Sequence, residues 1–475
     1  MLLRLILLPL ALAFLSHSQT VPAGQAIRAR LLSPVSSHSS RKGDPVRAVM
    51  TAPLQGADGI ALPAGTEIHG SVSSVRKVGL GFRNQTASLR LEFSQILPLG
   101  QAPIDISARV LEIENAREKV APDGKILGIL ATTSPHFLVD SRVKYLPTFR
   151  AWADPYMLAY KAAFPFFPEP EIFLPAGADL VLALEAPIEL PRALGVDESY
   201  LPAFAPEEIE ELNDLVQSLP ARTRTKPDGQ ESDIINLLFI GSPEEVISAF
   251  RSAAWAGSDR RSFRSLLRSA RAYFEHRTYP EAPMSRLYVD GRAQDMSWQK
   301  GLNSYAHRHH LRLWRIPSFW QGEDGWLVAA TRDAGIGVSL SRFHFYHRID
   351  PRIDEERNKV IEELAFHGCV AAYHLAARPN VARRSLNGTG DPMVTDGAVA
   401  AVRLQPCRAS FLALSGPVQK PGNFFSRLLR RQVLTVRHDV LNANIVLGPY
   451  QVVRALQRQL ARPPKPVHAF REGTP

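Results

Sequence analysis

Residues 308–314 read Arg-His-His-Leu-Arg-Leu-Trp, a pattern typical of a β-strand with two unlike faces. Because side chains alternate along a strand, both leucines share one face with a histidine, and both arginines share the other face with a histidine and a tryptophan. The leucine face must pack into a core, so His309 on that face is expected to be a buried histidine with a partner rather than a ligand. The polar face carries Arg308, His310, Arg312 and Trp314.

This polar face is a candidate surface for binding an anion, because guanidinium groups match the oxygens of phosphate or carboxylate in pairs. The alternative is a solvated face whose arginines form ion pairs with Asp295 or Asp333. If hydrolysis occurs there, His310 is the candidate base, oriented by Asp333 or Asp295. Arg308 and Arg312 would then hold the developing negative charge. The sequence leaves binding and catalysis open.

The flanking segments predict an α/β or α+β layer around this strand. Residues 234–241 read as a buried strand that ends in glycine, and residues 243–255 read as the helix after it. Further strands are expected at residues 285–289 and 326–330.

The N-terminal half is marked by a tetrapeptide that recurs before strand-like runs. Its three copies begin at Val21, Leu62 and Leu174, and each ends in Pro-Ala-Gly. Proline presets φ for a turn and glycine accepts positive φ, so each copy can reverse the chain and start a strand. Residues 87–93 alternate with period two and predict a half-buried strand. We therefore expect a β-rich barrel or sandwich over residues 20–190, interrupted by an insert near residues 126–168.

Four short motifs follow one another in this half: Gly-Asp-x-Val-x-Ala from Gly43, Leu-Pro-Ala-Gly-Thr from Leu62, Gly-x-Val from Gly70 and Leu-x-Leu-x-Phe from Leu89. Their order resembles the β-barrel domain of TrbI-like proteins of conjugation and type IV secretion systems, over residues 24–112. Such barrels assemble into envelope channels. The resemblance implies a non-catalytic scaffold, so a pure envelope-assembly component is one hypothesis for the whole chain.

The C-terminal half carries five motifs, namely Asn236–Ser242, Tyr279–Pro283, Gly291–Asp295, Arg308–Trp314 and His347–Pro351. Their order resembles the LssY C-terminal domain family over residues 231–405. One departure is Ala254, where the family pattern leads us to expect glycine; this should affect helix packing and not chemistry. The family domain also occurs fused to membrane phosphatases of the phosphatidic acid type, which implies envelope lipids as a context. The resemblance names no reaction.

The residues expected to bind an anionic, phosphate- or carboxylate-bearing and lipid-derived ligand are Arg292, Arg308, Arg312, Trp314, His347 and Arg357. Asp350 before Pro351 predicts a helix N-cap whose carboxylate is satisfied by backbone donors. Arg357 falls on the apolar stripe of that helix, so it needs a partner, with Asp354 and Asp295 as candidates. It is either a structural ion-pair member or the floor of the anion pocket. Serine-hydrolase and P-loop motifs are absent from the sequence, which disfavours those two chemistries.

Several histidines raise the question of a metal, since His307, His309, His310, His344 and His347 lie near Asp333 and Asp350 in the sequence. Their spacing matches no zinc motif. Residues 301–350 also hold six arginines against four acids, and fixed positive charge disfavours a cation. We expect no metal and no cofactor.

The first 18 residues predict export. A single arginine, an apolar run over residues 5–15 and small residues up to Ser18 form a secretory signal pattern. The run is too short to span a bilayer comfortably, so cleavage after Ser18 is expected. The mature chain is then expected in the periplasm or envelope, soluble or peripheral. Two cysteines permit at most one disulfide, and Cys369 reads as packing rather than a nucleophile.

The chain therefore divides into a signal peptide (1–18), a β-rich unit (20–190), a helix and linker (191–230, with the helix at 206–219), an LssY-like unit (231–405) and a basic tail (406–475). From residue 408 the tail holds eleven Lys or Arg against two acids, so it carries nearly all of the net charge of +10. A short amphipathic segment there is a candidate for peripheral membrane contact through Phe424, Phe425, Arg427, Arg430 and Arg431. Packing of its apolar face on the protein itself is the alternative. No nucleic-acid partner is expected.

Overall fold

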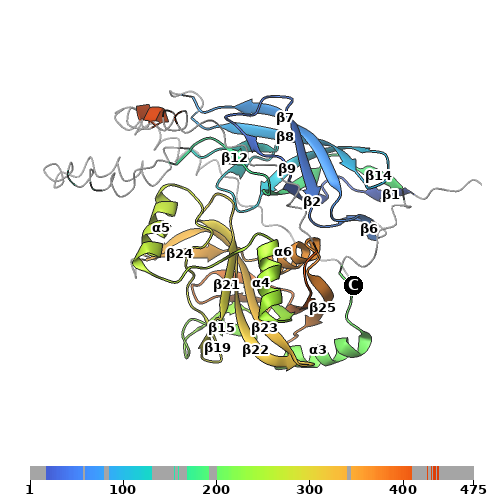
Figure 1. The fold of residues 1–475 in the computed structure, drawn as a ribbon, viewed down its shortest axis with the longest axis vertical. Coiled ribbons are helices and arrows are strands. Elements are labelled where there is room, and N and C mark those ends of the chain that lie inside the picture. The colour runs from blue at the N-terminus through green and yellow to red at the C-terminus, as the bar shows by residue number, and fades with distance from the viewer. Residues whose placement is uncertain are drawn as a thin grey trace, which may run out of the picture.

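The computed structural model describes residues 18–56, 59–79, 85–130, 168–191, 201–339 and 344–408, with a few single positions elsewhere. Figure 1 shows two β-rich units, one above the other, with the N-terminal unit in blue. The predicted multidomain architecture, a barrel followed by a mixed C-terminal unit, is confirmed. The expected signal peptide, most of the insert and most of the basic tail lie outside the described residues.

The N-terminal unit is a closed barrel of six antiparallel strands. It closes because β8 pairs with β7 on one side and β9 on the other. In barrel order the strands are β8 (Ser88–Leu97), β7 (Glu67–Arg76), β4 (Pro45–Met50), β2 (Ala26–Leu31), β13 (Asp179–Leu184) and β9 (Ile104–Ile113). Shorter strands flank them: β1 (Ser18–Val21), β3 (Val35–Ser36), β5 (Leu54–Gly56), β6 (Gly59–Leu62), β10 (Lys119–Val120), β11 (Lys125–Leu127), β12 (Phe173–Leu174) and β14 (Ile188–Pro191). Closure leaves no free edge on the six main strands.

The three Pro-Ala-Gly corners adopt the same turn, as predicted. Gly24, Gly65 and Gly177 have φ values of 84°, 90° and 91°. In each corner the proline carbonyl accepts a hydrogen bond from the amide three residues later, and the glycine amide donates to a carbonyl of a neighbouring segment. The corners lead into β2, β7 and β13. One local device thus starts three of the six barrel strands.

The C-terminal unit is built on an eight-stranded sheet. Its order is β18 (Ala256–Gly257), β21 (Met296–Lys300), β22 (His307–Trp320), β23 (Glu323–Ser339), β17 (Leu237–Ile240), β28 (Ala398–Leu404) and β25 (Val370–Ala377), with β24 (His344–Ile349) also on β23. Among the described strands of this sheet only β17 and β28 run parallel, so the unit is α+β. The long hairpin of β22 and β23 dominates it.

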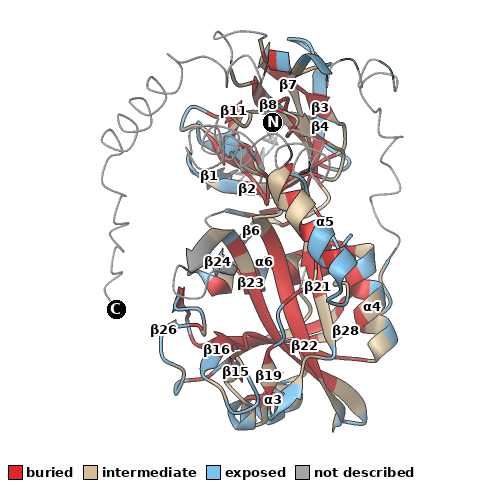
Figure 2. Ribbon diagram, turned by 90° about the vertical axis from the view of Figure 1, so that its left-hand side faces the viewer, coloured by how far each residue is buried: buried red, intermediate tan, exposed pale blue. Residues whose placement is uncertain are grey.

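Helices cover both faces of this sheet. The helices α4 (Pro243–Ser252) and α6 (Ile353–Phe366) pack on one face, and α3 (Pro206–Ser218) packs on the other. A small sheet of β15 (Arg222–Arg224), β16 (Glu231–Ile234), β19 (Tyr288–Val289) and β20 (Arg292–Ala293) lies on the α3 side. In Figure 2 the helix α5 (Phe263–Phe274) lies at the opposite end of the unit, toward the barrel, and β26 (Arg384–Leu386) pairs with β27 (Pro392–Val394) in a separate hairpin. No described helix has the length and apolar character needed to cross a bilayer.

Three local expectations need correction. The strand expected over residues 234–241 is broken between β16 and β17, at the buried Asn236. The side-chain NH2 of Asn236 donates to the carbonyls of Ala330 and Ile353, and its side-chain oxygen accepts from the Ala330 amide. The strand expected over residues 285–289 is shorter than expected and comprises only β19, Tyr288–Val289. The helix expected to start at Pro351 starts at Ile353, although the Asp350 carboxylate does accept the amide of Arg352, at 3.0 Å.

A buried ionic network joins the barrel to α6. Arg30 of β2 donates to both oxygens of Asp179 on β13, at 2.7 and 3.2 Å, and also to Glu363 of α6. Lys300 of β21 contacts Glu363 and lies 3.3 Å from Asp179, and Lys359 lies 3.5 Å from Asp179. All but Lys300 are buried. Figure 1 shows α6 directly below β2.

A second group of charges extends this interface to β22. Glu114, at the end of β9, accepts from Lys359 at 2.9 Å and from Arg28 at 3.0 Å. Nδ1 of His309 lies 2.6 Å from Glu356, and its Nε2 lies 3.5 Å from Glu114. Burial lowers the pKa of His309, but the two carboxylates raise it above the ordinary value. The prediction of a buried, partnered His309 is confirmed.

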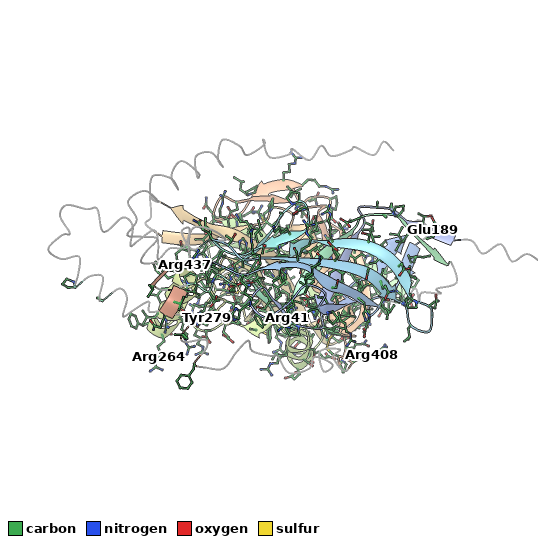
Figure 3. The ribbon with its side chains drawn as sticks, turned by 90° about the horizontal axis from the view of Figure 1, so that it is seen from above. Arg41, Glu189, Arg264, Tyr279, Arg408 and Arg437 are labelled. Atoms are coloured by element: carbon green, nitrogen blue, oxygen red, sulfur yellow. A yellow bond between two sulfur atoms is a disulfide. The ribbon has the colours of Figure 1, made fainter. Side chains whose placement is uncertain are left out.

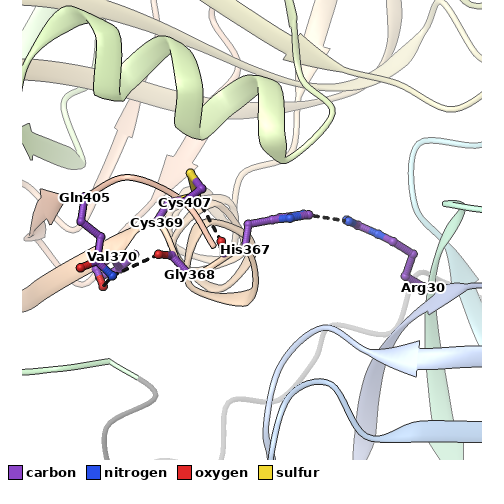
Figure 4. The surroundings of a disulfide bond; sticks show 7 residues. All are labelled: Arg30, His367, Gly368, Cys369, Val370, Gln405 and Cys407. Atoms are coloured by element: carbon purple, nitrogen blue, oxygen red, sulfur yellow. Dashed lines mark hydrogen bonds between the residues drawn. A yellow bond between two sulfur atoms is a disulfide. The ribbon is translucent and has the colours of Figure 1, made fainter. Parts of the chain in front are cut away.

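The disulfide Cys369–Cys407 lies beside the same interface. Figure 4 shows it next to His367, whose Nε2 is 3.2 Å from a guanidinium nitrogen of Arg30. Burial and the charge of Arg30 lower the pKa of His367 to about 4, so this imidazole is neutral and accepts from Arg30. The disulfide ties β25 to the segment after β28.

Removal of Arg30 should destabilise the fold. Burial alone would raise the pKa of Glu363, but Lys300, Lys359 and Arg30 lower it to about 2, so this carboxylate stabilises the fold above its unfolded pKa, and that contribution is lost as pH falls toward 2. Arg30→Met leaves Asp179 and Glu363 less compensated, which should lower the free energy of unfolding by about 3–5 kcal/mol. It should also raise the pH of acid unfolding, measured by circular dichroism.

The matched control is Arg47→Met, because Arg47 pairs with Glu67 on the barrel exterior and its side chain is 54% exposed. That change should cost less than about 1 kcal/mol. Equal urea midpoints for the two variants would show that the network does not hold the units together.

Candidate functional site

A cavity of about 1030 Å³ lies on the face of the central sheet opposite α4 and α6. Residues of β22, β23 and β24 line one side, and α5, the loop before β19, β16 and the loop after β26 line the rest. Its charged lining comprises four arginines (Arg261, Arg286, Arg308 and Arg312) and two aspartates (Asp233 and Asp333). Positive groups therefore exceed negative ones even with His310 and His347 neutral.

Asp333 is the hub of the cavity floor. Its carboxylate accepts from Nε of Arg308 at 2.8 Å and lies 3.1 Å from Nδ1 of His310 and 3.1 Å from Nδ1 of His347. Burial alone would raise the pKa of Asp333, but the nearby imidazoles and Arg308 hold it well below its ordinary value. A single fixed anion thus orients three cavity groups from two strands, β22 and β24.

Arg308 donates hydrogen bonds from two of its three guanidinium nitrogens, whereas Arg312 donates from all three. Arg308 also donates to Oε1 of Gln299 at 2.6 Å, and its Nη2 has no hydrogen bond to a described residue. Arg312 donates to Asp233 at 3.2 Å and to the hydroxyl of Ser285 at 3.0 Å. Burial lowers the pKa of Arg312, and the charge of Arg308 opposes its protonation further. The two cations are therefore close enough to repel each other.

The wall facing this floor is apolar. It includes α5 side chains that recur at helical spacing, namely Phe263, Leu266, Ala270, Tyr273 and Phe274. Pro283, Met284 and Leu287 continue it, and Ile336 and Ile349 add apolar side chains on the strands of the floor. Ser262 caps α5, accepting from the amide of Ser265 at 3.1 Å. The cavity is consequently amphiphilic, with charge on one side and hydrocarbon on the other.

Of the predicted site residues, the structure brings together Arg308, His310, Arg312, Asp333 and His347. They meet because alternate residues of β22 face the cavity, and because β23 and β24 pair beside it. The other four predicted site residues, Asp295, Arg292, Trp314 and Arg357, lie outside the cavity lining.

Asp295 and Arg292 are exposed and engage the backbone of Arg315 instead. Asp295 accepts the Arg315 amide at 2.8 Å, so it does not orient His310. Trp314 shares the cavity face of β22 but is fully buried in the core, and its indole donates to the carbonyl of Arg292. The side-chain direction was predicted correctly, but Trp314 packs against Leu287 and Val289 beside the small sheet and does not line the cavity.

Arg357 is a structural ion-pair member, one of the two roles predicted for it. It binds both oxygens of Asp396, each at 2.8 Å, Asp354 at 3.2 Å and the carbonyl of Ala398 at 3.1 Å. These partners satisfy its guanidinium away from the cavity. Arg357 does not line the cavity.

His310 is engaged at both ring nitrogens. Nε2 lies 2.7 Å from Oγ1 of Thr331, and Nδ1 faces Asp333. Thr331 is fully buried and does not line the cavity. This hydroxyl–imidazole–carboxylate chain has the order of a hydrolytic triad, but its hydroxyl is sealed in the sheet. The geometry favours a positioning role for His310.

His347 is the more accessible imidazole. Its side chain is 22% exposed, whereas that of His310 is 7% exposed. The ring of Tyr305 packs edge-on against it at 5.3 Å and also lies 5.6 Å from the Arg308 guanidinium. Among the described residues no cluster of histidine, cysteine, aspartate or glutamate has the geometry of a metal site.

Sequence reasoning missed Asp233, Tyr305 and the whole of α5. The apolar spacing of α5 and its Ser262 cap were visible signals. No local signal identifies Asp233 as the partner of Arg312, because 79 positions separate the two.

The cavity lies within the part of the chain that matches a known family. Residues 216–399 match the family model described as LssY C-terminus. The predicted resemblance is therefore confirmed, with both ends slightly earlier than expected. These residues are similar to the domain that the family model describes.

No curated protein matches the chain. Among solved structures, ComB10 of the Com type IV secretion system of Helicobacter pylori is similar, with 15% identity, a TM-score of 0.21, and coverage of 37% of this chain and 94% of that chain.

Asp333→Asn should destabilise the protein at neutral pH by about 3 kcal/mol, because it leaves Arg308 buried without its carboxylate. Since the folded pKa of Asp333 is lowered, its stabilisation is present above about pH 4 and fades as pH falls through the folded pKa. The difference between parent and variant in urea unfolding should therefore shrink on acidification.

The double variant Asp333→Asn/Arg308→Met tests whether the pair is coupled. Removing both charges should recover part of the loss, giving a non-additive cycle. Additive losses, or a parent–variant difference independent of pH, would refute the role of Asp333 as the hub.

Proposed function

We propose that the LssY C-terminal domain binds an anionic amphiphile in this cavity. The observation that carries the proposal is that the cavity lining as a whole holds four arginines against two aspartates and also presents an apolar wall. A phosphate or carboxylate head group would contact Arg308 and His347, and an acyl or similar chain would lie along α5. Such a ligand satisfies both halves of the lining, whereas a free inorganic anion satisfies only one.

The unbonded Nη2 of Arg308 supports this head-group position, since a guanidinium with one free nitrogen can still donate a hydrogen bond to an oxyanion. Burial lowers the pKa of Arg312, and the nearby charge of Arg308 adds to this effect, so an added anion would favour the charged form of Arg312. Both effects favour a negatively charged ligand.

Binding is favoured over turnover. A hydrolase would need an accessible nucleophile or a base with a free nitrogen, and both nitrogens of His310 face protein atoms. Hydrolysis through His310 stays the alternative, and release of free phosphate from the probe named below would establish it.

We also infer that the protein is exported to the periplasm or envelope. The signal pattern of residues 1–18 supports this, and so does the disulfide Cys369–Cys407, because stable disulfides form in oxidising compartments. An envelope location would bring the cavity near membrane lipids.

Ligand binding is tested by calorimetry with short-chain dihexanoyl phosphatidic acid and with inorganic phosphate. The amphiphile should bind at least about tenfold more tightly, because it also buries hydrocarbon. His347→Ala should weaken its binding about three- to tenfold, and Arg308→Gln should weaken it more. His374→Ala is the matched control, because His374 bonds to Asn213 at 2.9 Å, away from the cavity. Unchanged affinity in His347→Ala and Arg308→Gln counts against the proposal.

Export is tested by producing the chain with and without residues 1–18 in a Gram-negative host. The full chain should fractionate with the periplasm, with both cysteines protected from alkylation. The shortened chain should stay in the cytoplasm with free thiols. It should then unfold with a free energy about 4 kcal/mol smaller, since the disulfide closes a loop of 38 residues. Free thiols in the periplasmic protein, or no fractionation difference, would contradict the inference.

A further inference from the structure

The outer side of α5 exposes large apolar side chains beside the cavity. Phe263, Leu266 and Leu267 are 73%, 64% and 45% exposed. Phe263 and Leu266 also belong to the cavity lining, so the exposed patch adjoins the mouth. Figure 2 shows α5 beside the long strands β22 and β23, with exposed residues on its outer side.

The same segment is strongly basic. Residues 260–274 contain five arginines and no acid: Arg260, Arg261, Arg264, Arg268 and Arg271. Arg268 lies 3.7 Å from Asp259, and Arg271 pairs with Glu275. Within the described chain, Arg260, Arg261 and Arg264 form no ion pair, and Figure 3 shows Arg264 at the edge of the molecule. We define the α5 surface as Arg260, Phe263, Arg264, Leu266, Leu267 and Arg268.

The composition of the α5 surface favours a membrane over a second copy of the chain as its partner. Exposed Phe and Leu side chains flanked by arginines are the pattern of a helix that lies in a membrane interface. Anionic lipid adds about 1 kcal/mol of attraction for each arginine near the surface, and long arginine side chains can reach phosphates while the helix sinks in. A second copy fits poorly, because it would set the arginines of one helix against those of another.

We propose that the α5 surface docks on a bilayer containing anionic phospholipid, with the cavity mouth against the head-group layer. Phe263 and Leu266 belong both to the α5 surface and to the cavity lining. A lipid chain leaving the bilayer would therefore pass from the membrane core to the apolar wall of the cavity without crossing water. Docking stands on the α5 surface alone; the passage of a lipid into the cavity rests on the proposed function.

The docking variant is Arg264→Gln/Leu267→Ser/Arg268→Gln, whose three positions lie outside the cavity lining. The full-length protein is floated with phosphatidylcholine vesicles with and without phosphatidylglycerol. The parent should bind only the anionic vesicles, and less at high salt. The variant should bind at least about twentyfold more weakly, with roughly fivefold from each arginine. Its affinity for dihexanoyl phosphatidic acid should be unchanged, so loss of docking and failure of the ligand proposal are distinguishable.

Two control variants test whether flotation depends on another exposed leucine or on the basic tail. Leu99→Ser removes a fully exposed leucine from the barrel unit and should not affect flotation. Phe425→Ser/Leu429→Ser alters the basic tail. The other tail residues predicted to contact a membrane, Phe424, Arg427, Arg430 and Arg431, lie outside the described part of the chain. Flotation that depends on the tail and not on α5 overturns the proposal. A change of molar mass by light scattering in the docking variant also overturns it, since it would identify a second copy as the occupant.

Insertion is read directly with Leu267→Trp. In vesicles that contain brominated acyl chains, this variant should gain quenching relative to the parent, whereas Leu99→Trp should not. Equal quenching of both tryptophans would show that α5 does not enter the interface.

Discussion

The fold depends on the ionic network that Arg30 organises between the barrel and α6. A buried guanidinium is costly to desolvate, and it is tolerated here because Asp179 and Glu363 both contact it. Two buried carboxylates would in turn repel each other without Lys300 and Lys359. The groups therefore require one another across the interface, since Asp179 contacts two lysines of the second unit and Glu363 contacts Arg30 of the barrel. This mutual requirement fixes the barrel against the second unit in one orientation.

Strand β22 carries the consequence of that contact to the cavity. His309 faces Glu114 and Glu356 at the interface, while the next residue, His310, faces Asp333 on the cavity side. A one-residue slip of the strand would exchange these faces and place each histidine in the wrong environment. The barrel contact thus helps to keep β22 in the register that builds the cavity floor.

Alternation along residues 308–314 was sufficient to predict which side chains share a face, because that rule is local. The same rule could not separate Trp314 from its neighbours, since burial of that end depends on the small sheet above it. The need of Arg357 for a partner was predictable from its helix stripe, but Asp396 was not, because that contact comes from tertiary packing. Arg30 and Glu363, 333 positions apart, give no local signal of their pairing. The apolar spacing of α5 was a readable pattern; its position over the cavity was not.

The charges of the cavity floor indicate that the floor serves binding rather than stability. Asp333 pairs with Arg308, and Asp233 pairs with Arg312. Burial and the charge of Arg308 nevertheless lower the pKa of Arg312. A floor selected only for stability would be filled with apolar side chains, which cost less than paired charges of similar volume. Local arrangements that reduce stability are expected where a protein binds something. The groups of the floor fit that reading, because an anion is the one partner that would improve the electrostatics of both arginines together.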